Sequence, residues 1–344
     1  MSPTPLLELQ NLSIGLKARH VAYDIVREVS LELYENEILA IVGESGCGKS
    51  LTALSILGLH ASPPLYVTGG SIVYRDRDIT DLPPDDLQKI RGTEIAMVFQ
   101  DPMTALDPMF TVGTLLTTAV RSHQDVSKAQ AREIAISALA DAGIDDPVQR
   151  FESYPFQLSG GVSQRVMIAL ALVNDPKVII ADEPTTALDV TVQAQILERL
   201  MELKEERGMS IMLITHNLGV VASVADRMAV MYTGEIVESG SVEEVLTSPR
   251  HHYTAGLLGA VPRMSSHRDE AVAGQREPVR PDDPMGVRRG ALIPVPGRVP
   301  QPDELPPGCS FAERCPQADD RCRTDQPQLT ALAGRLVRCH HPRG

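Results

Sequence analysis

Short apolar runs recur along the first 260 residues, and segments with helical periodicity stand between them. The runs 38–42, 94–99, 177–181 and 211–214 are short and mainly apolar, which predicts strands. A stripe of apolar residues along 127–142, ended by a glycine, predicts a helix. Strands and helices are therefore expected in succession over this part of the chain.

Two further features extend this pattern. Positions 6–14 and 26–33 alternate between apolar and polar residues, which predicts a small β-layer ahead of the first apolar run. A mainly helical stretch lies between Gln100 and Leu158. We expect it to form a helical subdomain at about 103–175.

The character of the chain changes beyond Ala260. Residues 261–290 are polar and poor in large apolar side chains, which predicts a linker. Residues 291–344 are rich in proline, which disfavours helices, and they carry four of the five cysteines. We therefore expect one domain over 1–260, then the linker, then a small C-terminal extension.

Charge and hydropathy narrow the classes of function. The net charge of −13 argues against broad attraction to nucleic acid or to anionic lipid, because both need a positive field. No apolar run approaches the roughly 20 residues that span a bilayer, and the N-terminus has no signal-peptide core. The odd number of cysteines makes a disulfide framework improbable in a reducing compartment. We expect a cytoplasmic protein that docks on a membrane partner.

The stretch after the first apolar run has the composition of a phosphate-binding loop. Its sequence is Gly43-Glu44-Ser45-Gly46-Cys47-Gly48-Lys49-Ser50, and a helical pattern begins at Leu51. Glycines let successive backbone N–H groups converge on phosphate oxygens, and the helix N-terminus adds partial positive charge. In such a loop Lys49 reaches the outer phosphates and Ser50 binds Mg²⁺. The motif predicts nucleotide binding, with a plain glycine turn as the alternative.

Polar residues at the ends of three other predicted strands suit the same chemistry. Asp182 and Glu183 follow one strand, where the first acid can hold Mg²⁺ and the second can orient an attacking water. Gln100 ends another strand, where its amide can reach a metal-bound water or a phosphate. His216 ends a third, where it can donate a hydrogen bond to a terminal phosphate. A solvated acidic turn and a structural histidine are the alternatives.

Two more features bear on a nucleotide. The run Ser159-Gly160-Gly161 opens a second helix in the manner of an anion site, which a single phosphate site does not require. Tyr23 lies just ahead of the strand predicted at 26–33, where its ring can stack on a purine base with about 1–3 kcal/mol. A tyrosine that merely covers the sheet edge explains the same position equally well.

Four cysteines predict a metal in the C-terminal extension. They are Cys309, Cys315, Cys322 and Cys339, with the spacing C-x5-C-x6-C-x16-C. A lobe with so few apolar residues should need a metal to fold. Four thiolates suit a tetrahedral zinc or an iron–sulfur cluster, and the tight C-x2-C pairs of common zinc ribbons are absent. Scattered free cysteines are the alternative.

Together these motifs resemble those of the ATPase subunits of ATP-binding-cassette (ABC) transporters. Six motifs stand in the family's order: the loop 43–50, Gln100, the signature 158–165, the strand ending in Asp182-Glu183, the loop 187–189 and His216. Within that family, 99–108 and 308–316 are similar to the oligopeptide/dipeptide and nickel importer group. Val162-Ser163 replaces the more usual Met-Arg of that group, but lies after the two glycines of the signature.

The resemblance implies an α/β fold. This is an ABC-type P-loop ATPase with an antiparallel β-subdomain, a RecA-like core and a helical subdomain, here with a small cysteine-rich C-terminal lobe. It implies that Glu183, His216 and Gln100 serve catalysis, and that Ser50, Gln100 and Asp182 hold Mg²⁺. It places the following residues against ATP: Tyr23, all of Gly43 to Leu51, Ser159, Gly160, Gly161, Gln164 and Asp189. In this group the four tail cysteines hold a [4Fe-4S] cluster, with Zn²⁺ as the alternative.

The resemblance also implies partners. Two such subunits, here expected to be paralogues, face each other so that each signature completes the other's phosphate loop. They work with two permease subunits and an extracytoplasmic solute-binding protein, and lie peripherally on the cytoplasmic face of the membrane. The expected function is ATP-driven import of di- or oligopeptides, with nickel or another small solute as the alternative cargo.

Two rival functions are weaker. An ABC ATPase that acts on nucleic acid should have long coiled coils or two cassettes and a basic surface, whereas this chain has one short cassette and is acidic. A regulatory ATPase with a zinc-binding tail would differ in the metal that the purified protein carries.

Overall fold

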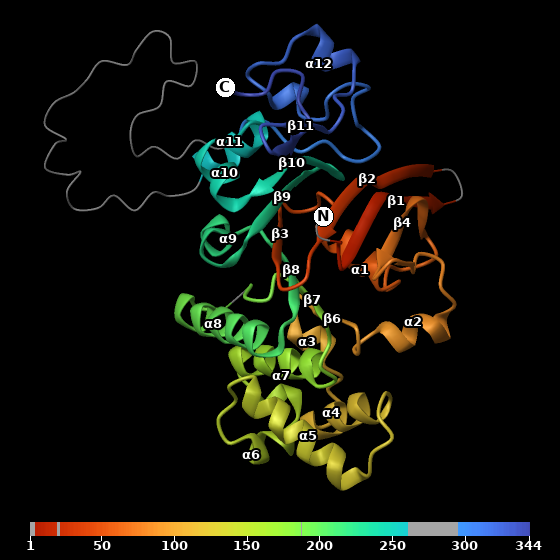
Figure 1. The fold of residues 1–344 in the computed structure, drawn as a ribbon, viewed down its shortest axis with the longest axis vertical. Coiled ribbons are helices and arrows are strands. Elements are labelled where there is room, and N and C mark those ends of the chain that lie inside the picture. The colour runs from red at the N-terminus through yellow and green to blue at the C-terminus, as the bar shows by residue number, and fades with distance from the viewer. Residues whose placement is uncertain (1–3, 19–20, 187, 261–294) are drawn as a thin grey trace, which may run out of the picture.

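The computed structural model describes residues 4–18, 21–186, 188–260 and 295–344. The predicted linker, 261–290, lies outside these residues. Figure 1 shows three levels along the long axis of the molecule: helices α3 to α7 at one end, the sheets in the middle, and the C-terminal segment at the other end. We call the described residues 295–344 the C-terminal lobe.

An antiparallel sheet forms the predicted β-layer. Its strand order is β2-β1-β4-β5, with bounds β1 Leu7–Ala18, β2 Val21–Leu33, β4 Leu65–Tyr74 and β5 Arg77–Asp78. Leu7 and Leu9 of β1 are buried on one face because strand side chains point to opposite faces in turn, and a register shift after Leu9 brings Leu12 to the buried side as well. They share a core with Ala53 and Ile56 of helix α1 (Lys49–Ile56). This sheet therefore packs on the helix that follows the phosphate loop.

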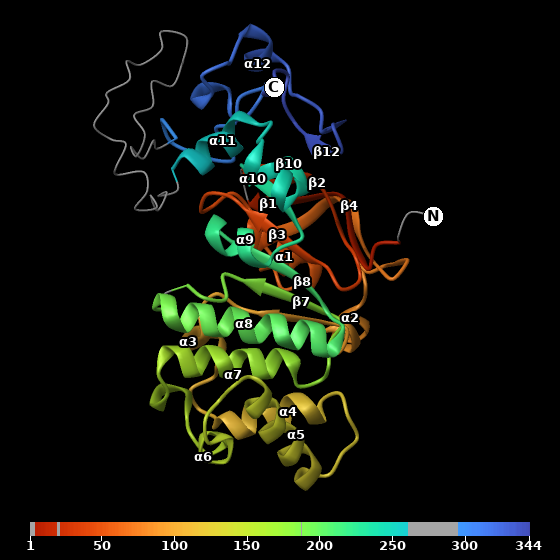
Figure 2. The ribbon, with the colours of Figure 1, turned by 60° about the vertical axis from the view of Figure 1, so that its left-hand side comes forward.

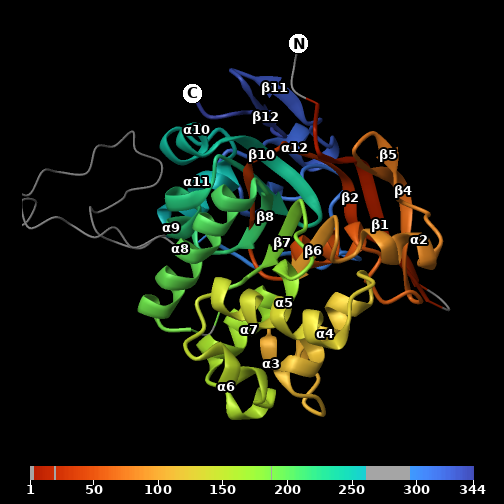
Figure 3. The same cartoon turned by 60° about the horizontal axis from the view of Figure 1, so that its bottom comes forward.

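A second, eight-stranded sheet forms the centre of the molecule. Its order is β11-β12-β10-β9-β3-β8-β7-β6, and the strands from β9 to β6 run parallel. Their bounds are β3 Ile38–Val42, β6 Ile95–Val98, β7 Val178–Asp182, β8 Ser210–Thr215 and β9 Arg227–Tyr232. Figure 3 shows the antiparallel sheet on one side of this sheet and helices α8 (Val190–Arg207) and α9 (Leu218–Val224) on the other. Covered on both faces, these strands are almost wholly apolar, which is why they were recognisable in the sequence.

The parallel strands bring the predicted polar residues to one edge. In register, Val98 pairs with Ala181, Asp182 with Ile214 and Val42 with Thr215. The residues that follow these strands therefore emerge side by side at the carboxyl end of the sheet, where ligands bind in open α/β sheets.

A helical subdomain follows β6. Its elements are α3 Pro102–Ala105, α4 Val112–Arg121, α5 Lys128–Asp141, α6 Pro147–Phe151, the 3₁₀ turn η1 Pro155–Gln157 and α7 Gly160–Leu172. Leu116, Ala135 and Leu139 are fully buried where α4, α5 and α7 pack together. Figure 2 shows α7 running alongside α8.

The C-terminal lobe is joined to the central sheet. Strand β10 (Glu235–Ser241) pairs with β12 (Arg335–Val337), which pairs with β11 (Thr330–Leu332). The sequence did not predict β11 and β12, because strands of three residues carry no periodic signal. The remaining elements are α2 Pro84–Ile90, α10 Val242–Thr247, α11 His252–Gly259, η3 Ala312–Arg314 and α12 Asp320–Thr324.

An aromatic cluster strengthens this junction. The ring of Phe311 lies edge-on to Tyr232 with centroids 5.4 Å apart, and 5.5 Å from that of Tyr253. All three side chains are buried. The lobe thus shares both a sheet and an apolar core with the first domain.

Candidate active site

The phosphate loop has the backbone that its glycines allow. Gly46 and Gly48 adopt φ values of +81° and +106°, which side chains with a Cβ rarely tolerate. At Gly43 a Cβ would lie 2.2 Å from the carbonyl oxygen of Met231. Cys47 is buried beneath the loop, and burial raises the pKa of its thiol. The loop therefore packs tightly against β9 and turns directly into α1.

Lys49 lies under this loop. Its side chain is buried, and Nζ donates to the carbonyl oxygens of Gly43 at 2.9 Å and of Glu44 at 3.0 Å. These carbonyls satisfy the ammonium group in the protein shown here. A phosphate placed over the loop would take over that role, since an anionic oxygen is the stronger acceptor.

Asp182 and Ser50 fit a magnesium ion. Asp182 is 4% exposed, and its Oδ1 has no hydrogen-bond partner among the described residues. Burial raises the pKa of this carboxyl, and a hydrogen bond with the Ser50 hydroxyl offsets part of that shift. A buried carboxylate with a free oxygen beside a hydroxyl is the donor set of a hard cation. Mg²⁺ at these two residues would supply the charge that balances the phosphates.

Glu183 is held by three side chains from three elements. Oε2 accepts from Gln100 Nε2 at 2.9 Å and from Thr186 Oγ1 at 2.8 Å, and Oε1 lies 3.1 Å from Nδ1 of His216. The residue has φ of +46°, an uncommon backbone for glutamate. The structure thus brings together the three predicted catalytic residues, Gln100, Glu183 and His216. With Ser50 and Asp182 they form what we call the catalytic edge.

The charge of Glu183 is set by these contacts. Burial raises the pKa of the carboxyl, but hydrogen bonds from His216 and Thr186 more than reverse this, so that the net shift is downward. The carboxylate is therefore ionised at neutral pH and can accept a proton or a hydrogen bond from water. Its position next to Asp182 places it beside the metal site.

The predicted signature motif lies in the helical subdomain, at the start of helix α7. Ser159 is the N-cap of α7, and both it and Gly160 are exposed. A Cβ on Gly160 would touch Leu188, and one on Gly161 would lie 2.9 Å from Val192 of α8. The exposed helix start is therefore open to another molecule.

Three predicted nucleotide contacts have other surroundings in this structure. Gln164 is 2% exposed, so its side chain does not reach the surface with the rest of the signature. Asp189 is the N-cap of α8 and accepts from the backbone N–H of Val192 at 3.0 Å. Tyr23 lies within β2, opposite Leu16, and not ahead of the strand as predicted, because β2 begins five residues earlier than the alternation indicated. Contact of these three residues with ATP stays a prediction.

The four cysteines of the C-terminal lobe meet at one place. Cys309, Cys315, Cys322 and Cys339 line a single small cavity, together with His251, His252, His340 and His341. Burial is the main cause of a raised pKa at all four thiols, and the nearby sulfurs add to it at Cys309, to about 12, and at Cys339, to about 11. Thiols gathered in this way fit a metal that binds thiolates.

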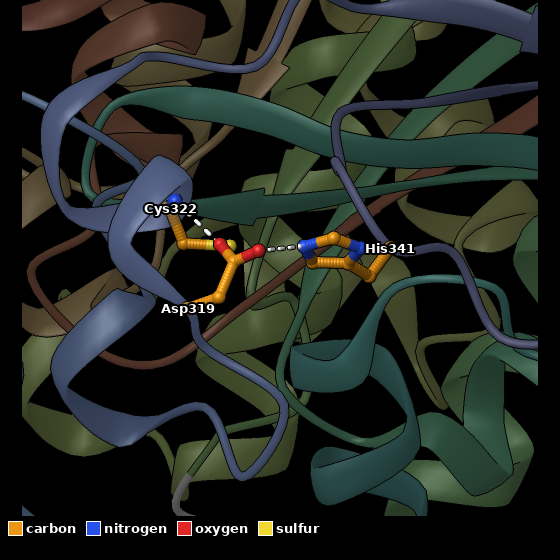
Figure 4. Close-up of side chains that lie close together, drawn as sticks. All are labelled: Asp319, Cys322 and His341. Atoms are coloured by element: carbon orange, nitrogen blue, oxygen red, sulfur yellow. Dashed lines mark hydrogen bonds and ion pairs between the residues drawn. The ribbon is translucent and has the colours of Figure 1, made fainter.

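A carboxylate supports this cavity. Asp319 Oδ1 accepts from the backbone N–H of Cys322 at 2.9 Å, and Oδ2 accepts from Nε2 of His341 at 2.8 Å (Figure 4). These contacts lower the pKa of Asp319 to about 2. Asp319 therefore fixes the start of α12 and the last histidine of the chain around one of the cysteines.

Sequence reasoning missed two residues that lie close to the catalytic edge. Thr186 donates to Glu183, and Gln193 Nε2 donates at 3.0 Å to the carbonyl oxygens of Thr185 and Leu188. A hydroxyl three residues after the glutamate is a local signal that could have identified Thr186. Gln193 has no such signal, because its role depends on how α8 lies against the loop before it.

Comparison with known protein families gives two matches. The family model described as "ABC transporter" matches residues 26–186. The model described as "Oligopeptide/dipeptide transporter, C-terminal region" matches residues 237–285 and 283–322.

Curated relatives match almost the whole chain. Dipeptide transport ATP-binding protein DppD of Bacillus subtilis (strain 168) is 46% identical over 94% of this chain and 91% of its own length. Oligopeptide transport ATP-binding protein AppD of the same organism is 44% identical over 97% and 96%. DppD of Escherichia coli (strain K12) is 41% identical over 98% and 97%.

Solved structures share the fold. The ATP-binding cassette MJ0796, as a dimer in a post-hydrolysis state bound to ADP and Pi, is 30% identical with a TM-score of 0.62. The match covers 69% of this chain and 98% of the MJ0796 chain.

Proposed function

The chain belongs to the ABC transporter family as an ATP-binding subunit of the oligopeptide/dipeptide group, and from this premise we propose how it powers peptide import. The subunit hydrolyses ATP, and closure and reopening of a dimer of such subunits drives a membrane permease. The observation that carries this proposal is the clamp on Glu183, which three side chains hold ionised beside the magnesium site.

We propose a task for each residue. The loop N–H groups and Lys49 would bind the β- and γ-phosphates, and Ser50 and Asp182 would hold Mg²⁺. Glu183 would orient the attacking water, while His216 and Gln100, which contact its carboxylate, would also serve the γ-phosphate. The preset positions of these groups lower the cost of reorganisation at the moment of reaction.

The second subunit completes this site. Ser159 and Gly160 are exposed at the start of α7, and they do not cover the phosphate loop of their own chain. The related cassette MJ0796 forms a dimer with nucleotide. We propose that a second ABC ATPase subunit, a paralogue of this chain, brings its own signature onto Gly43 to Ser50.

Several exposed apolar side chains of the helical subdomain suit the permease. Met103 is 50% exposed and Met109 79%, and Phe110, Tyr154 and Phe156 are exposed in the same subdomain. The rings of Tyr154 and Phe156 stack with centroids 5.5 Å apart. We propose that two permease subunits dock on this subdomain and that a solute-binding protein delivers the peptide from outside.

No helix among the described residues has the length and hydropathy to cross a bilayer. We propose, from the family resemblance, that the subunit lies peripherally on the cytoplasmic face of the membrane.

The C-terminal lobe holds a metal in this proposal. The four thiols around one cavity fit a [4Fe-4S] cluster, with Zn²⁺ as the alternative. The group would crosslink the segments 309–322 and 339, which carry its four thiols. Iron with acid-labile sulfide after anaerobic purification supports the cluster, whereas stoichiometric zinc supports the alternative.

We propose that the cargo is a dipeptide or an oligopeptide, the cargo given in the names of the relatives. Nickel or another small solute is the alternative cargo, and transport assays with the permease and binding protein in liposomes separate the two. Binding to nucleic acid stays the minor alternative, and salt-dependent binding of DNA or RNA would support it.

The decisive experiment replaces the carboxylate. Glu183→Gln should lower kcat for ATP hydrolysis by about 10²- to 10⁴-fold, while ATP binding and ATP-driven dimer formation persist. Glu133→Gln, an exposed glutamate of α5, is the matched control and should retain parental turnover. Hydrolysis at the parental rate in Glu183→Gln would refute the assignment.

A further inference from the structure

An arginine of the C-terminal lobe reaches the phosphate loop. Arg314 Nη2 lies 3.2 Å from Oε1 of Glu44, and Nη1 lies 3.3 Å from Oε2. This is a two-pronged contact between residues 270 positions apart. Planar, paired bonds of this kind fix orientation as well as distance.

The lobe holds the guanidinium in a single orientation. Nε donates to the carbonyl oxygen of Pro296 at 2.7 Å, and Nη1 donates to the hydroxyl of Tyr232 at 3.3 Å. The group also lies 5.9 Å from the ring centroid of Phe311. The side chain of Arg314 is 6% exposed. Since each donor has a partner and the ring blocks one face, Arg314 has little freedom to release Glu44 and turn to solvent.

Glu44 contacts three residues, through its backbone N–H, its carbonyl oxygen and its carboxylate. Its backbone N–H donates to the hydroxyl of Tyr253 at 2.9 Å, and its carbonyl oxygen accepts from Lys49 at 3.0 Å. Its carboxylate takes the two bonds from Arg314. Arg314 therefore binds the residue whose carbonyl oxygen accepts a hydrogen bond from Lys49.

We infer that Arg314 is a positioning residue for ATP binding, through which the C-terminal lobe presets the phosphate loop. With Glu44 held, the loop keeps its backbone N–H groups in the binding arrangement before ATP arrives, so less conformational entropy is lost on binding. Without Arg314, the carboxylate of Glu44 loses both of these bonds, and the loop loses this restraint. The inference rests on the proposed function and extends it to a residue outside the ATPase motifs.

A purely structural role of Arg314 predicts a different result. If the pair only fastened the lobe to the core, its loss would lower stability and leave ATP affinity unchanged. A positioning role acts on affinity and spares the saturated rate, because Glu183 and its three partners do not touch Arg314. The separation of Kd from kcat therefore distinguishes the two.

The experiment is a double-mutant cycle in the full chain. Arg314→Met, Glu44→Gln and the double variant are titrated with a fluorescent ATP analogue, and kcat is measured at saturating ATP. We expect Arg314→Met to weaken binding about tenfold with kcat within twofold of the parent. In the Glu44→Gln background the same change should weaken binding less than twofold, because its target has gone.

Controls keep the outcomes separate. Arg298→Met removes an arginine of the same lobe that pairs with Glu304 at the surface, and it should leave Kd unchanged. Glu44→Gln tests the same contact from the partly exposed loop side should Arg314→Met fold poorly, and it should itself weaken binding. Unchanged Kd in either single variant, or an equal loss in both backgrounds, would overturn the inference. A parent chain that binds no ATP would instead overturn the proposed function.

Discussion

The catalytic edge and the C-terminal lobe both bury charged groups, but these groups differ in the partners that they contact. At the edge Asp182 keeps an oxygen without a partner among the described residues, and Lys49 rests on carbonyls that a phosphate can replace. At the joint with the lobe, the buried Glu235 of β10 contacts four side chains: Arg27, Ser310, Gln326 and Arg338. The free oxygen of Asp182 therefore leaves a position for a cation, whereas the carboxylate of Glu235 already has its partners.

The largest contrast should come from two cysteine substitutions. Cys339→Ser removes one of four thiols around the cavity and should abolish binding of the metal proposed there, since a three-thiol site no longer completes the set. Cys47→Ser, the matched change in the phosphate loop, should leave metal content at the parental level. Iron, sulfide and zinc analysis of anaerobically purified protein measures both. Equal metal content in the two variants would place the metal outside this cavity.

A smaller effect should follow from loss of a buried arginine in the joint. Arg335 Nη1 lies 3.5 Å from the fully buried Glu238 and donates to the carbonyl oxygens of Glu244 and Ser248 at 3.0 and 2.7 Å. Arg335→Met should therefore lower the free energy of unfolding by about 3–5 kcal/mol.

The control for this change lies in the same lobe. Arg298→Met breaks an exposed pair and should cost about 0–1 kcal/mol. Urea unfolding compares the two. Similar midpoints would show that the joint carries no more stability than a surface ion pair.

The smallest effect concerns the catalytic edge. Thr186→Val removes one of the hydrogen bonds to Glu183 and keeps the shape of the side chain. The expected loss is about 0.5–1.5 kcal/mol of transition-state stabilisation, or roughly 2- to 12-fold in kcat. Thr186→Ser keeps the hydroxyl and should stay close to the parent. Steady-state ATPase assays decide, and equal rates for the two variants would remove Thr186 from the site.

Much of the catalytic edge could be predicted because its residues follow apolar strands. The strands β6, β7 and β8 are buried, so their sequences have an unmistakable composition, and parallel pairing brings their ends together. Gln100, Glu183 and His216 thereby meet at one edge. Thr186 has only a local signal, a hydroxyl three residues after the glutamate.

The joint between the lobe and the core could not be predicted. The sequence indicated a separate metal-dependent lobe, but β12 pairs with β10 and Phe311 packs on Tyr232. Three-residue strands and contacts between residues 79 or more positions apart leave no periodic signal. The pairing of Arg314 with Glu44 is the extreme case, since 270 positions separate the two residues.

The span between Glu44 and Arg314 also sets an order of events during synthesis. At about 5–20 residues per second, the 270 positions between the two correspond to roughly 15 to 50 s of translation. A nascent chain therefore carries its complete phosphate loop well before it carries Arg314, the residue that holds Glu44 of that loop.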